Sequence, residues 1–250
     1  MDPSASLASA GDAQSRIATN LRRVHETIAD AAHRAGRDPA AIRLIAVSKT
    51  MPSTVIEAAW RAGQTEFGEN MVQDALAKIP SFQGRNLTWH FIGHLQSNKA
   101  KFIPGHFSWV HSIDSLALAQ KLSQVCQRKG MHMNALVQIN VSGEASKYGI
   151  APEELYSLMD KLLSLDLSGI RLRGLMTLGR FHAADDELRC CFAQLRDLRD
   201  GCQQRFGLSD LSELSMGMTQ DYPLAVAEGA TMVRIGTAIF GERAPKARKE

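Results

Sequence analysis

The stretch IRLIAVSKT, residues 42–50, decides how the fold is read. Apart from Arg43, its first six residues are apolar, as in a parallel strand that is buried on both faces. The turn that follows, Val47-Ser48-Lys49-Thr50, contains no glycine. An open doubly wound sheet that binds a nucleotide needs a glycine-rich turn at this place. The stretch therefore favours another arrangement of parallel strands, with a lysine at the carboxyl end of the first.

Seven further strand candidates follow and alternate with helical patterns. The apolar segments lie at residues 66–67, 88–92, 108–110, 135–139, 170–175, 211–214 and 231–235. Helical spacing of apolar residues appears at 12–36, 53–62, 69–79, 97–103, 115–129, 152–164, 185–206 and 221–229. This count predicts an α/β protein with a single TIM (β/α)8 barrel and an extra N-terminal helix. An open doubly wound sheet is the alternative, but it usually stops at about five to seven strands.

The length agrees with one barrel. The chain has 250 residues, and a TIM barrel typically takes about 250. No shift in composition marks a linker, so we predict one domain over residues 12–243. Residues 1–11 are small and polar and are expected to be disordered, and residues 244–250 form a basic tail. If the barrel uses the whole chain, no residues remain for a second domain.

Charge, hydropathy and cysteine use narrow the class of function. The net charge of +3 comes without a nucleic-acid-binding motif. The sequence contains no run of about 18 apolar residues, so no membrane span is predicted, and the first residues do not resemble a signal peptide. The four cysteines show no CxxC spacing, so we expect free thiols in the cytoplasm. His90 and His94 form an HxxxH across a strand end, without the glutamate of a zinc-binding HExxH helix, so no metal site is expected.

The carboxyl ends of the predicted strands carry the titratable residues, and barrels place their active sites there. Lys49 follows an apolar strand, so we expect its stem to be packed and its amine to emerge at the mouth of the barrel. A desolvated lysine near another cation has a lowered pKa and can form a Schiff base with an aldehyde or ketone. The alternative is a rim lysine paired with Glu69 or another acid, and position alone leaves both open.

The ends of the last two predicted strands are suited to phosphate, which TIM barrels often bind there. The segments are Ser215-Met216-Gly217 and Gly236-Thr237. Glycine lets backbone N–H groups approach phosphate oxygens, and the hydroxyl groups add donors. Each segment alone is equally typical of an ordinary turn. Together with a lysine at the same mouth, they indicate a phosphorylated carbonyl compound.

Arg234 provides a further signal. If Val233 and Ile235 face the helices, Arg234 points into the barrel, where a buried arginine needs a partner. It forms a structural ion pair or donates a hydrogen bond to an aromatic ring nitrogen, and the sequence leaves both open.

Seven motifs resemble the pyridoxal phosphate homeostasis proteins, the YggS/PROSC family, over about residues 15–243. They are AVSKT (46–50), FGEN (67–70), WHFIGHLQSNK (89–99), SKYG (146–149), RGLM (173–176), LSMGM (214–218) and MVRIGTAIFG (232–241). The resemblance implies an alanine-racemase-like barrel that carries pyridoxal 5′-phosphate (PLP).

The same resemblance assigns roles to residues of this chain. Lys49 is expected to hold PLP as a Schiff base, and Arg234 to face the pyridine nitrogen, where an arginine weakens PLP as an electron sink. The residues expected to hold the phosphate are Ser215, Gly217, Gly236 and Thr237. The residues expected to line the rest of the pocket, or to lie near it, are Asn70, His90, Met218 and Lys147.

The resemblance predicts a carrier that acts in PLP homeostasis and supplies apoenzymes, without catalysing a reaction. A PLP-dependent amino-acid racemase or decarboxylase on the same barrel is the alternative, and a cofactor-free Schiff-base aldolase is a further one. Racemases of this fold take a second base, a tyrosine, from an added domain of a partner subunit. The length leaves no room for such a domain, and Tyr148 is the one tyrosine expected near the mouth. A monomer is therefore expected.

Overall fold

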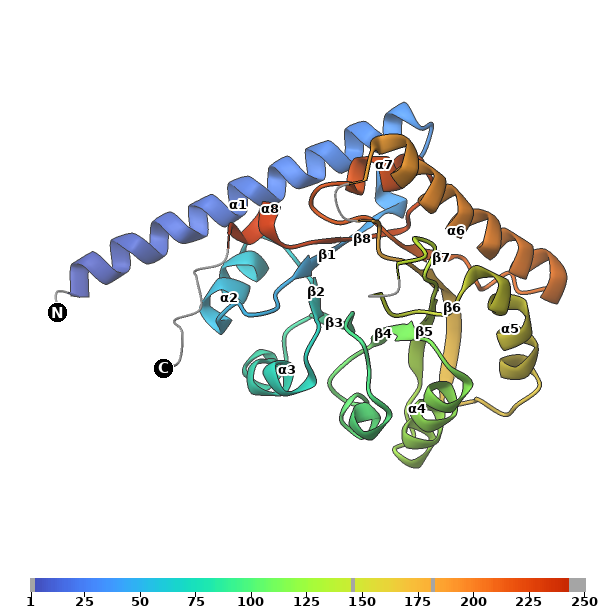
Figure 1. The fold of residues 1–250 in the computed structure, drawn as a ribbon. Coiled ribbons are helices and arrows are strands. Elements are labelled where there is room, and N and C mark those ends of the chain that lie inside the picture. Colours follow the sequence, from blue (N-terminus) through green and yellow to red (C-terminus); the bar gives the residue numbers. More distant parts are fainter. Residues whose placement is uncertain (1–2, 145–146, 181–182, 243–250) are drawn as a thin grey trace.

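A computed structural model describes residues 3–144, 147–180 and 183–242. Its strands are parallel, pair in sequence order and close into a barrel through the pairing of β8 with β1 (Figure 1). The strands are β1 (Arg43–Val47), β2 (Glu66–Glu69), β3 (Thr88–Phe91), β4 (Trp109–Ile113), β5 (Met133–Gln138), β6 (Ile170–Met176), β7 (Glu213–Ser215) and β8 (Met232–Ile235). The predicted TIM barrel is confirmed, and the closed sheet rules out the doubly wound alternative.

Helical segments separate the strands at the places the sequence predicts. The α-helices are α1 (Pro3–Arg34), α2 (Ser53–Arg61), α3 (Val72–Lys78), α4 (Leu116–Arg128), α5 (Leu155–Leu163), α6 (Asp185–Phe206), α7 (Tyr222–Ala227) and α8 (Thr237–Phe240). The 3-10 segments are η1 (Pro39–Ala41), η2 (Ile79–Phe82), η3 (Ser97–Phe102) and η4 (Pro152–Glu154). The helix predicted at 97–103 is therefore a short 3-10 segment.

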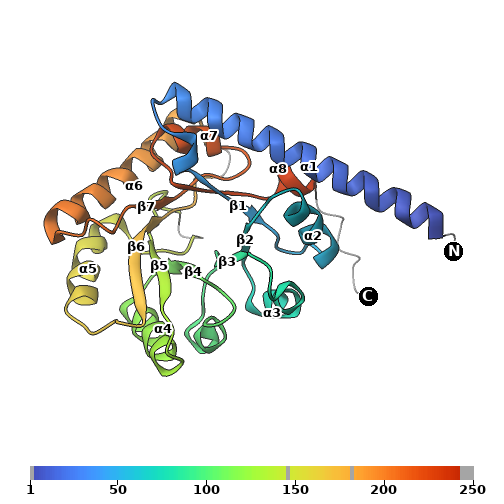
Figure 2. The same cartoon turned by 180° about the vertical axis from the view of Figure 1, so that it is seen from behind.

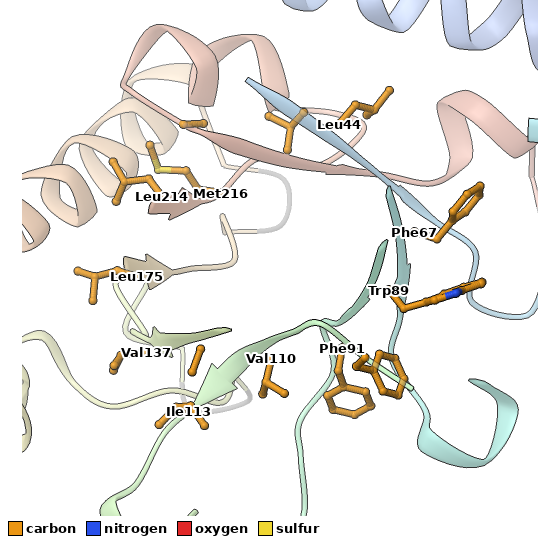
Figure 3. Close-up of a cluster of buried hydrophobic side chains, with 14 of the residues drawn as sticks. Leu44, Phe67, Trp89, Phe91, Val110, Ile113, Val137, Leu175, Leu214 and Met216 are labelled. Atoms are coloured by element: carbon orange, nitrogen blue, oxygen red, sulfur yellow. The ribbon is translucent and has the colours of Figure 1, made fainter. Parts of the chain in front are cut away.

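Alternate residues of each strand point outward and form the main hydrophobic core between the sheet and the helices. Figure 3 shows outward-pointing side chains of this layer, among them Phe67, Phe91 and Leu175. All three are 0–1% exposed. Burying a side chain of this size stabilises a fold by about 1.5–3 kcal/mol, so this layer holds the strand ends in place.

The remaining residues of the strands fill the inside of the barrel, and these are of two kinds. An apolar cluster consists of Ile45, Trp109, Leu136, Met176 and Met232. Polar side chains from β2, β3, β4, β7 and β8 share the interior with it: Glu66, His90, His111, Ser215 and Arg234. Buried polar groups need partners, so their hydrogen bonds decide what this interior can do.

Helix α1 lies along α2, α7 and α8 (Figures 1 and 2). Its Asn20 side chain donates to the carbonyl of Ile239 in α8 at 2.9 Å, which ties the helix to the end of the barrel. The helix begins at Pro3, before the predicted start at residue 12. Extending a packed helix adds one hydrogen bond per ordered residue, and alanine favours this. Residues 1–2 and 243–250, including the basic tail, lie outside the described residues.

The described residues bear on two further features, membrane-spanning helices and the state of the cysteines. Within them, no helix is long and apolar enough to cross a membrane. Cys126 and Cys202 are buried free thiols, and Cys190 and Cys191 are free thiols nearer the surface.

Candidate functional site

Lys49 lies in the turn directly after β1, where it is half-buried. Strand β1 pairs with β2 on one side and with β8 on the other. Asn70, just beyond β2, and Gly236, just beyond β8, are therefore at the same end of the barrel as Lys49. This end is the mouth that the sequence predicts for a ligand.

The backbone next to this lysine is strained. Thr50 has a φ of 67° and is the only non-glycine with a positive φ among the residues that the structure describes. A β-branched residue avoids this left-handed region, so the surroundings must impose it. The turn is closed by a hydrogen bond of 3.0 Å from the N–H of Met51 to the carbonyl of Ser48. The position of the Lys49 backbone is thus fixed against local preference.

A buried ion pair supports the turn from outside the barrel. The carboxylate of Glu69 is completely buried, and its Oε1 accepts from Nζ of Lys78 in α3 at 2.7 Å. The hydroxyl of Ser48 donates to the same oxygen at 2.6 Å, and Lys78 also donates to the carbonyl of Ser48 at 3.1 Å. Glu69 therefore anchors the residue that precedes Lys49.

Arg234 points into the barrel, as the alternation around it predicts. Val233 and Ile235 belong to the outer core, and Arg234 is only 3% exposed. Its Nη1 donates to the hydroxyl of Ser215 at 2.6 Å, and its Nη2 donates to the carbonyl of Thr177 at 2.8 Å. Burial lowers its pKa to about 10, partly opposed by the charge of Asp221. Arg234 is thus a cation at neutral pH, with its guanidinium oriented by two acceptors.

The segment after β7 passes very close to α7. Gly217 has a φ of 93°, and a Cβ there would lie 2.6 Å from the Cβ of Ala225 and 3.0 Å from the Cα of Tyr222. Only glycine fits this position. The next residue, Met218, donates its backbone N–H to a carboxylate oxygen of Asp221 at 2.5 Å. Burial raises the pKa of this carboxyl group, and the hydrogen bond from Met218 opposes the rise.

The segment after β8 is more open. Gly236 is half-buried, and Thr237, the first residue of α8, is exposed. A Cβ at Gly236 would meet only ordinary contacts, the nearest being the carbonyl oxygen of Val47 at 3.4 Å. Neither its φ nor its packing demands glycine. Because the residue has no side chain, space remains beside β1, the strand that precedes Lys49.

Ser215 directs its hydroxyl into the barrel. Besides accepting from Arg234, Oγ lies 2.9 Å from Nδ1 of His111, and the residue has no exposed surface. The other ring nitrogen of His111 lies 3.0 Å from Nδ1 of His90. Nε2 of His90 lies 3.0 Å from Oε2 of Glu66, at hydrogen-bonding distance but without hydrogen-bond alignment. A continuous row of polar contacts thus runs from Glu66 to Arg234.

Both imidazole rings in this row are fully buried. Burial lowers the pKa of His90, and the contact with Glu66 partly opposes this. Burial also holds the pKa of His111 well below its ordinary value, and the positive charges of Arg234 and Arg43 act in the same direction. Both rings are therefore neutral at neutral pH.

The loop after β5 folds over the same end of the barrel. Nζ of Lys147 donates to the carbonyl of Gly179 at 2.7 Å and lies 2.8 Å from Oε2 of Glu144. Arg180 lies 3.2 Å from the other oxygen of Glu144. The hydrogen bond from Lys147 lowers the pKa of Glu144. Lys147 thus links the loop after β5 to the loop after β6.

Asn70 lines a cavity of about 310 Å³ at the mouth, together with His94, Lys99 and Tyr148. Tyr148 stacks on His94 with ring centroids 3.8 Å apart and is 57% exposed. Tyr148 is therefore near the mouth, as predicted. Of the other tyrosines, Tyr156 packs on Phe206 and Tyr222 belongs to α7.

The structure places most of the residues predicted for the ligand site at the carboxyl end of the barrel, and His90 is the exception. Those at or beyond the carboxyl ends of their strands are Lys49, Asn70, Lys147, Ser215, Gly217, Met218, Gly236 and Thr237, and Arg234 is one residue before the end of β8. His90 is instead covered inside the barrel, where it contacts Glu66 and His111. Sequence reasoning did not include His111, Thr177 and Asp221 among the residues of the site. The inward alternation of β4 could have suggested His111, whereas the other two depend on loop geometry.

The side chains of His90 and His94, the two histidines of the HxxxH, point to different places. His90 points into the barrel, and His94 lies in the next loop with Nδ1 3.3 Å from Asp114. Among the described residues, no group of three or more metal-ligating side chains occurs.

Comparisons with known proteins identify similar chains. Residues 14–244 match the family model described as the N-terminal domain of alanine racemase. The chain is 46% identical over 229 residues to the pyridoxal phosphate homeostasis protein of Pseudomonas aeruginosa, covering 92% of this chain and 96% of that protein. It is 44% identical over 233 residues to the protein of that name from Escherichia coli, covering 91% and 97%.

Solved structures show the same likeness. PipY of Synechococcus elongatus with PLP bound is 38% identical, with a TM-score of 0.79 over 90% of this chain and all of that chain. An alanine racemase of Clostridium difficile is 16% identical, with a TM-score of 0.68, and this chain covers 57% of it. At that identity the likeness to the racemase concerns the fold alone.

Proposed function

This chain belongs to the pyridoxal phosphate homeostasis proteins, which share the fold of the alanine racemase N-terminal domain, and we propose that it binds PLP and acts in its homeostasis. One observation carries the proposal. The adjacent strands β1 and β8 bring the half-buried amine-bearing Lys49 and the buried guanidinium of Arg234 to one mouth. A lysine and a cationic donor at one site match an aldehyde and a ring nitrogen of the same small molecule.

The residues of the site fit PLP. Arg234 uses two of its five N–H donors on Ser215 and Thr177, which leaves donors for a pyridine nitrogen. Gly236 has an ordinary φ, and its packing would admit a side chain, so the absence of one leaves space beside β1. The polar and glycine residues at the ends of β7 and β8 supply backbone N–H groups for a phosphate. We assign the phosphate to Ser215, Gly217, Gly236 and Thr237, with Asn70 and Met218 beside the ring.

PLP supplies an aldehyde that reacts with a primary amine and a ring that accepts electrons. The chain's own residues hold it: Lys49 covalently, as a Schiff base, and Arg234 by hydrogen bonding. Because a guanidinium only donates, it leaves the ring nitrogen unprotonated and makes the ring a weaker electron acceptor than an acidic partner would. This chemistry favours storage and delivery of PLP over turnover.

The proposal therefore includes supply of PLP to apoenzymes without catalysis. The curated relatives carry the name of homeostasis proteins, which supports this over a racemase or decarboxylase. We further propose that the protein works in the cytoplasm as a monomer. Sedimentation of the PLP-loaded protein would check the oligomeric state.

The direct test is loading with PLP followed by dialysis. We expect the wild type to keep an absorbance band of bound PLP, and Lys49→Ala to lose it. Lys121→Ala, which removes an exposed lysine of α4, is the matched control. Borohydride reduction and peptide mass spectrometry should place PLP on Lys49. A wild type that stays colourless after loading would contradict the proposal.

A second measurement separates a carrier from an enzyme. The PLP-loaded protein is incubated with each amino acid, and the products are analysed for racemisation and decarboxylation. Sustained turnover would count against a carrier. Transfer of PLP to an apoenzyme faster than free release would show direct delivery.

A further inference from the structure

The polar row inside the barrel has one consistent pattern of hydrogen atoms. Nε2 of His90 lies 3.0 Å from Oε2 of Glu66, without hydrogen-bond alignment, and a carboxylate oxygen only accepts, so the contact is favourable when Nε2 of His90 carries the hydrogen. A neutral His90 then accepts at Nδ1, so the facing Nε2 of His111, 3.0 Å away, must donate. A neutral His111 in turn accepts at Nδ1, so Ser215 donates its hydroxyl hydrogen to it.

The far end of the row agrees with this direction. A guanidinium has only donors, so Arg234 donates to Oγ of Ser215 at 2.6 Å. Every link from Arg234 through Ser215, His111 and His90 to Glu66 therefore points the same way. Reversing one link would set two donors or two acceptors against each other, which costs the desolvation of buried groups.

From this geometry we propose that Glu66, His90 and His111 are positioning residues for the PLP site: they fix the hydroxyl of Ser215 toward the interior and hold the guanidinium of Arg234 in place. The inference rests on the proposed PLP site. His90 has no exposed surface and acts through His111 instead of touching the ligand. The Ser215 hydroxyl, committed to His111, has no hydrogen left for a phosphate, so in this arrangement Gly217, Gly236 and Thr237 hold the phosphate.

Charged groups from four strands face the two imidazoles. Besides Glu66 from β2, they face Arg43 from β1, Glu213 from β7 and Arg234 from β8. The two arginines and full burial keep His111 neutral, and a neutral ring is the form that can both donate and accept.

The first test reads the hydrogen positions directly and needs no PLP. Nitrogen-15 NMR of the histidine side chains at neutral pH should show both His90 and His111 as neutral rings protonated on Nε2. The variants His90→Gln and His111→Gln assign the signals. A ring protonated on Nδ1, or a charged ring, at either position would overturn the proposal.

The second test links the row to the ligand. Glu66→Gln keeps the shape of the side chain, but an amide can either accept or donate a hydrogen bond. The variant therefore no longer fixes which ring nitrogen of His90 carries the hydrogen. Glu213→Gln is the matched control, because it removes the same charge from the same interior, where Glu213 pairs with Arg43 at 2.8 Å.

For Glu66→Gln we expect the PLP dissociation constant to rise about fivefold, as for loss of one buried polar contact, with mixed tautomers at His90. Glu213→Gln should bind PLP like the wild type. Thermal melting confirms that both variants fold. An unchanged constant in folded Glu66→Gln, or an equal rise in both variants, would overturn the proposal. A wild type without PLP affinity would overturn the proposed function and the positioning role, while the NMR result would still decide the hydrogen pattern.

Discussion

Arg234 and His111 share a single hydroxyl group, that of Ser215. Nη1 of Arg234 lies 2.6 Å from it and Nδ1 of His111 lies 2.9 Å from it. The guanidinium at the mouth is therefore connected to the barrel interior by one side chain. This connection makes the ligand site sensitive to residues that the ligand does not touch.

Replacing Arg234 is expected to weaken PLP retention. Arg234→Ala removes the proposed donor to the ring nitrogen and leaves the Thr177 carbonyl without its partner. We expect the dissociation rate of PLP, followed by absorbance during dialysis, to rise about tenfold or more, as for loss of a charged hydrogen bond. Arg173→Ala removes an arginine of β6 that pairs with exposed Asp210 and serves as control. Equal retention in both variants would refute the role of Arg234.

Adding a methyl group at Gly217 is expected to disturb the segment after β7. In Gly217→Ala the new Cβ would lie 2.6 Å from that of Ala225, so α7 or the segment must shift. Gly130→Ala also has a positive φ, 63°, but no atom within 4 Å of the added Cβ. Backbone strain alone costs about 1–3 kcal/mol. We expect Gly217→Ala to lose more stability in urea than the control, and also PLP affinity. Equal losses would mean that close packing is unimportant there.

Breaking the buried ion pair beneath the lysine turn is expected to be costly. Lys78→Met leaves the carboxylate of Glu69, which has no exposed surface, without its cation. Removal of one partner of such a pair typically costs about 3–5 kcal/mol of unfolding free energy. Arg61→Met, which breaks an exposed pair with Glu57, should change stability by less than about 0.5 kcal/mol. The double variant Lys78→Met/Glu69→Leu should recover part of the loss, and failure to recover would argue against an uncompensated charge.

Mild acid is expected to destabilise the fold. His90 and His111 have lowered pKa values in the folded protein, whereas unfolded histidines protonate below about 6.5. The unfolded state therefore binds more protons as the pH falls below this value, and stability decreases with it. We expect full stability above pH 6.5 and a loss of about 1.4 kcal/mol per pH unit below it for each ring that stays neutral.

Urea unfolding at a series of pH values measures this slope. His111→Gln should reduce it, whereas His132→Gln, at an exposed position, should not reproduce that reduction. A wild type with constant stability between about pH 7.5 and 5.5 would show that the interior rings titrate normally.

The sequence predicted the strands well because most of them are short apolar runs between polar turns, and this pattern is local. The alternation of side chains along a strand predicted that Arg234 points inward once Val233 and Ile235 face the helices. Lys49 could be placed at the mouth because a strand end has a known position in a barrel.

The interior contacts could not be predicted in this way. Ser215 comes from β7 and His111 from β4, and their distance depends on how the strands stagger when the barrel closes. Sequence spacing contains no information about that stagger. His90 was accordingly expected at the pocket, and the structure places it beneath, on the far side of His111.

The pairing of β1 with β8 has a consequence for synthesis of the protein. Lys49 leaves the ribosome early, while Arg234 and Gly236 are among the last residues of the barrel to be made. Helix α1, the first element translated, packs on α7 and α8, the last ones. A nascent chain that stops before β8 lacks Arg234, Gly236 and Thr237 of the site, and it lacks α8, one of the helices on which its first helix packs. Retention of the ligand would therefore distinguish finished molecules from truncated ones.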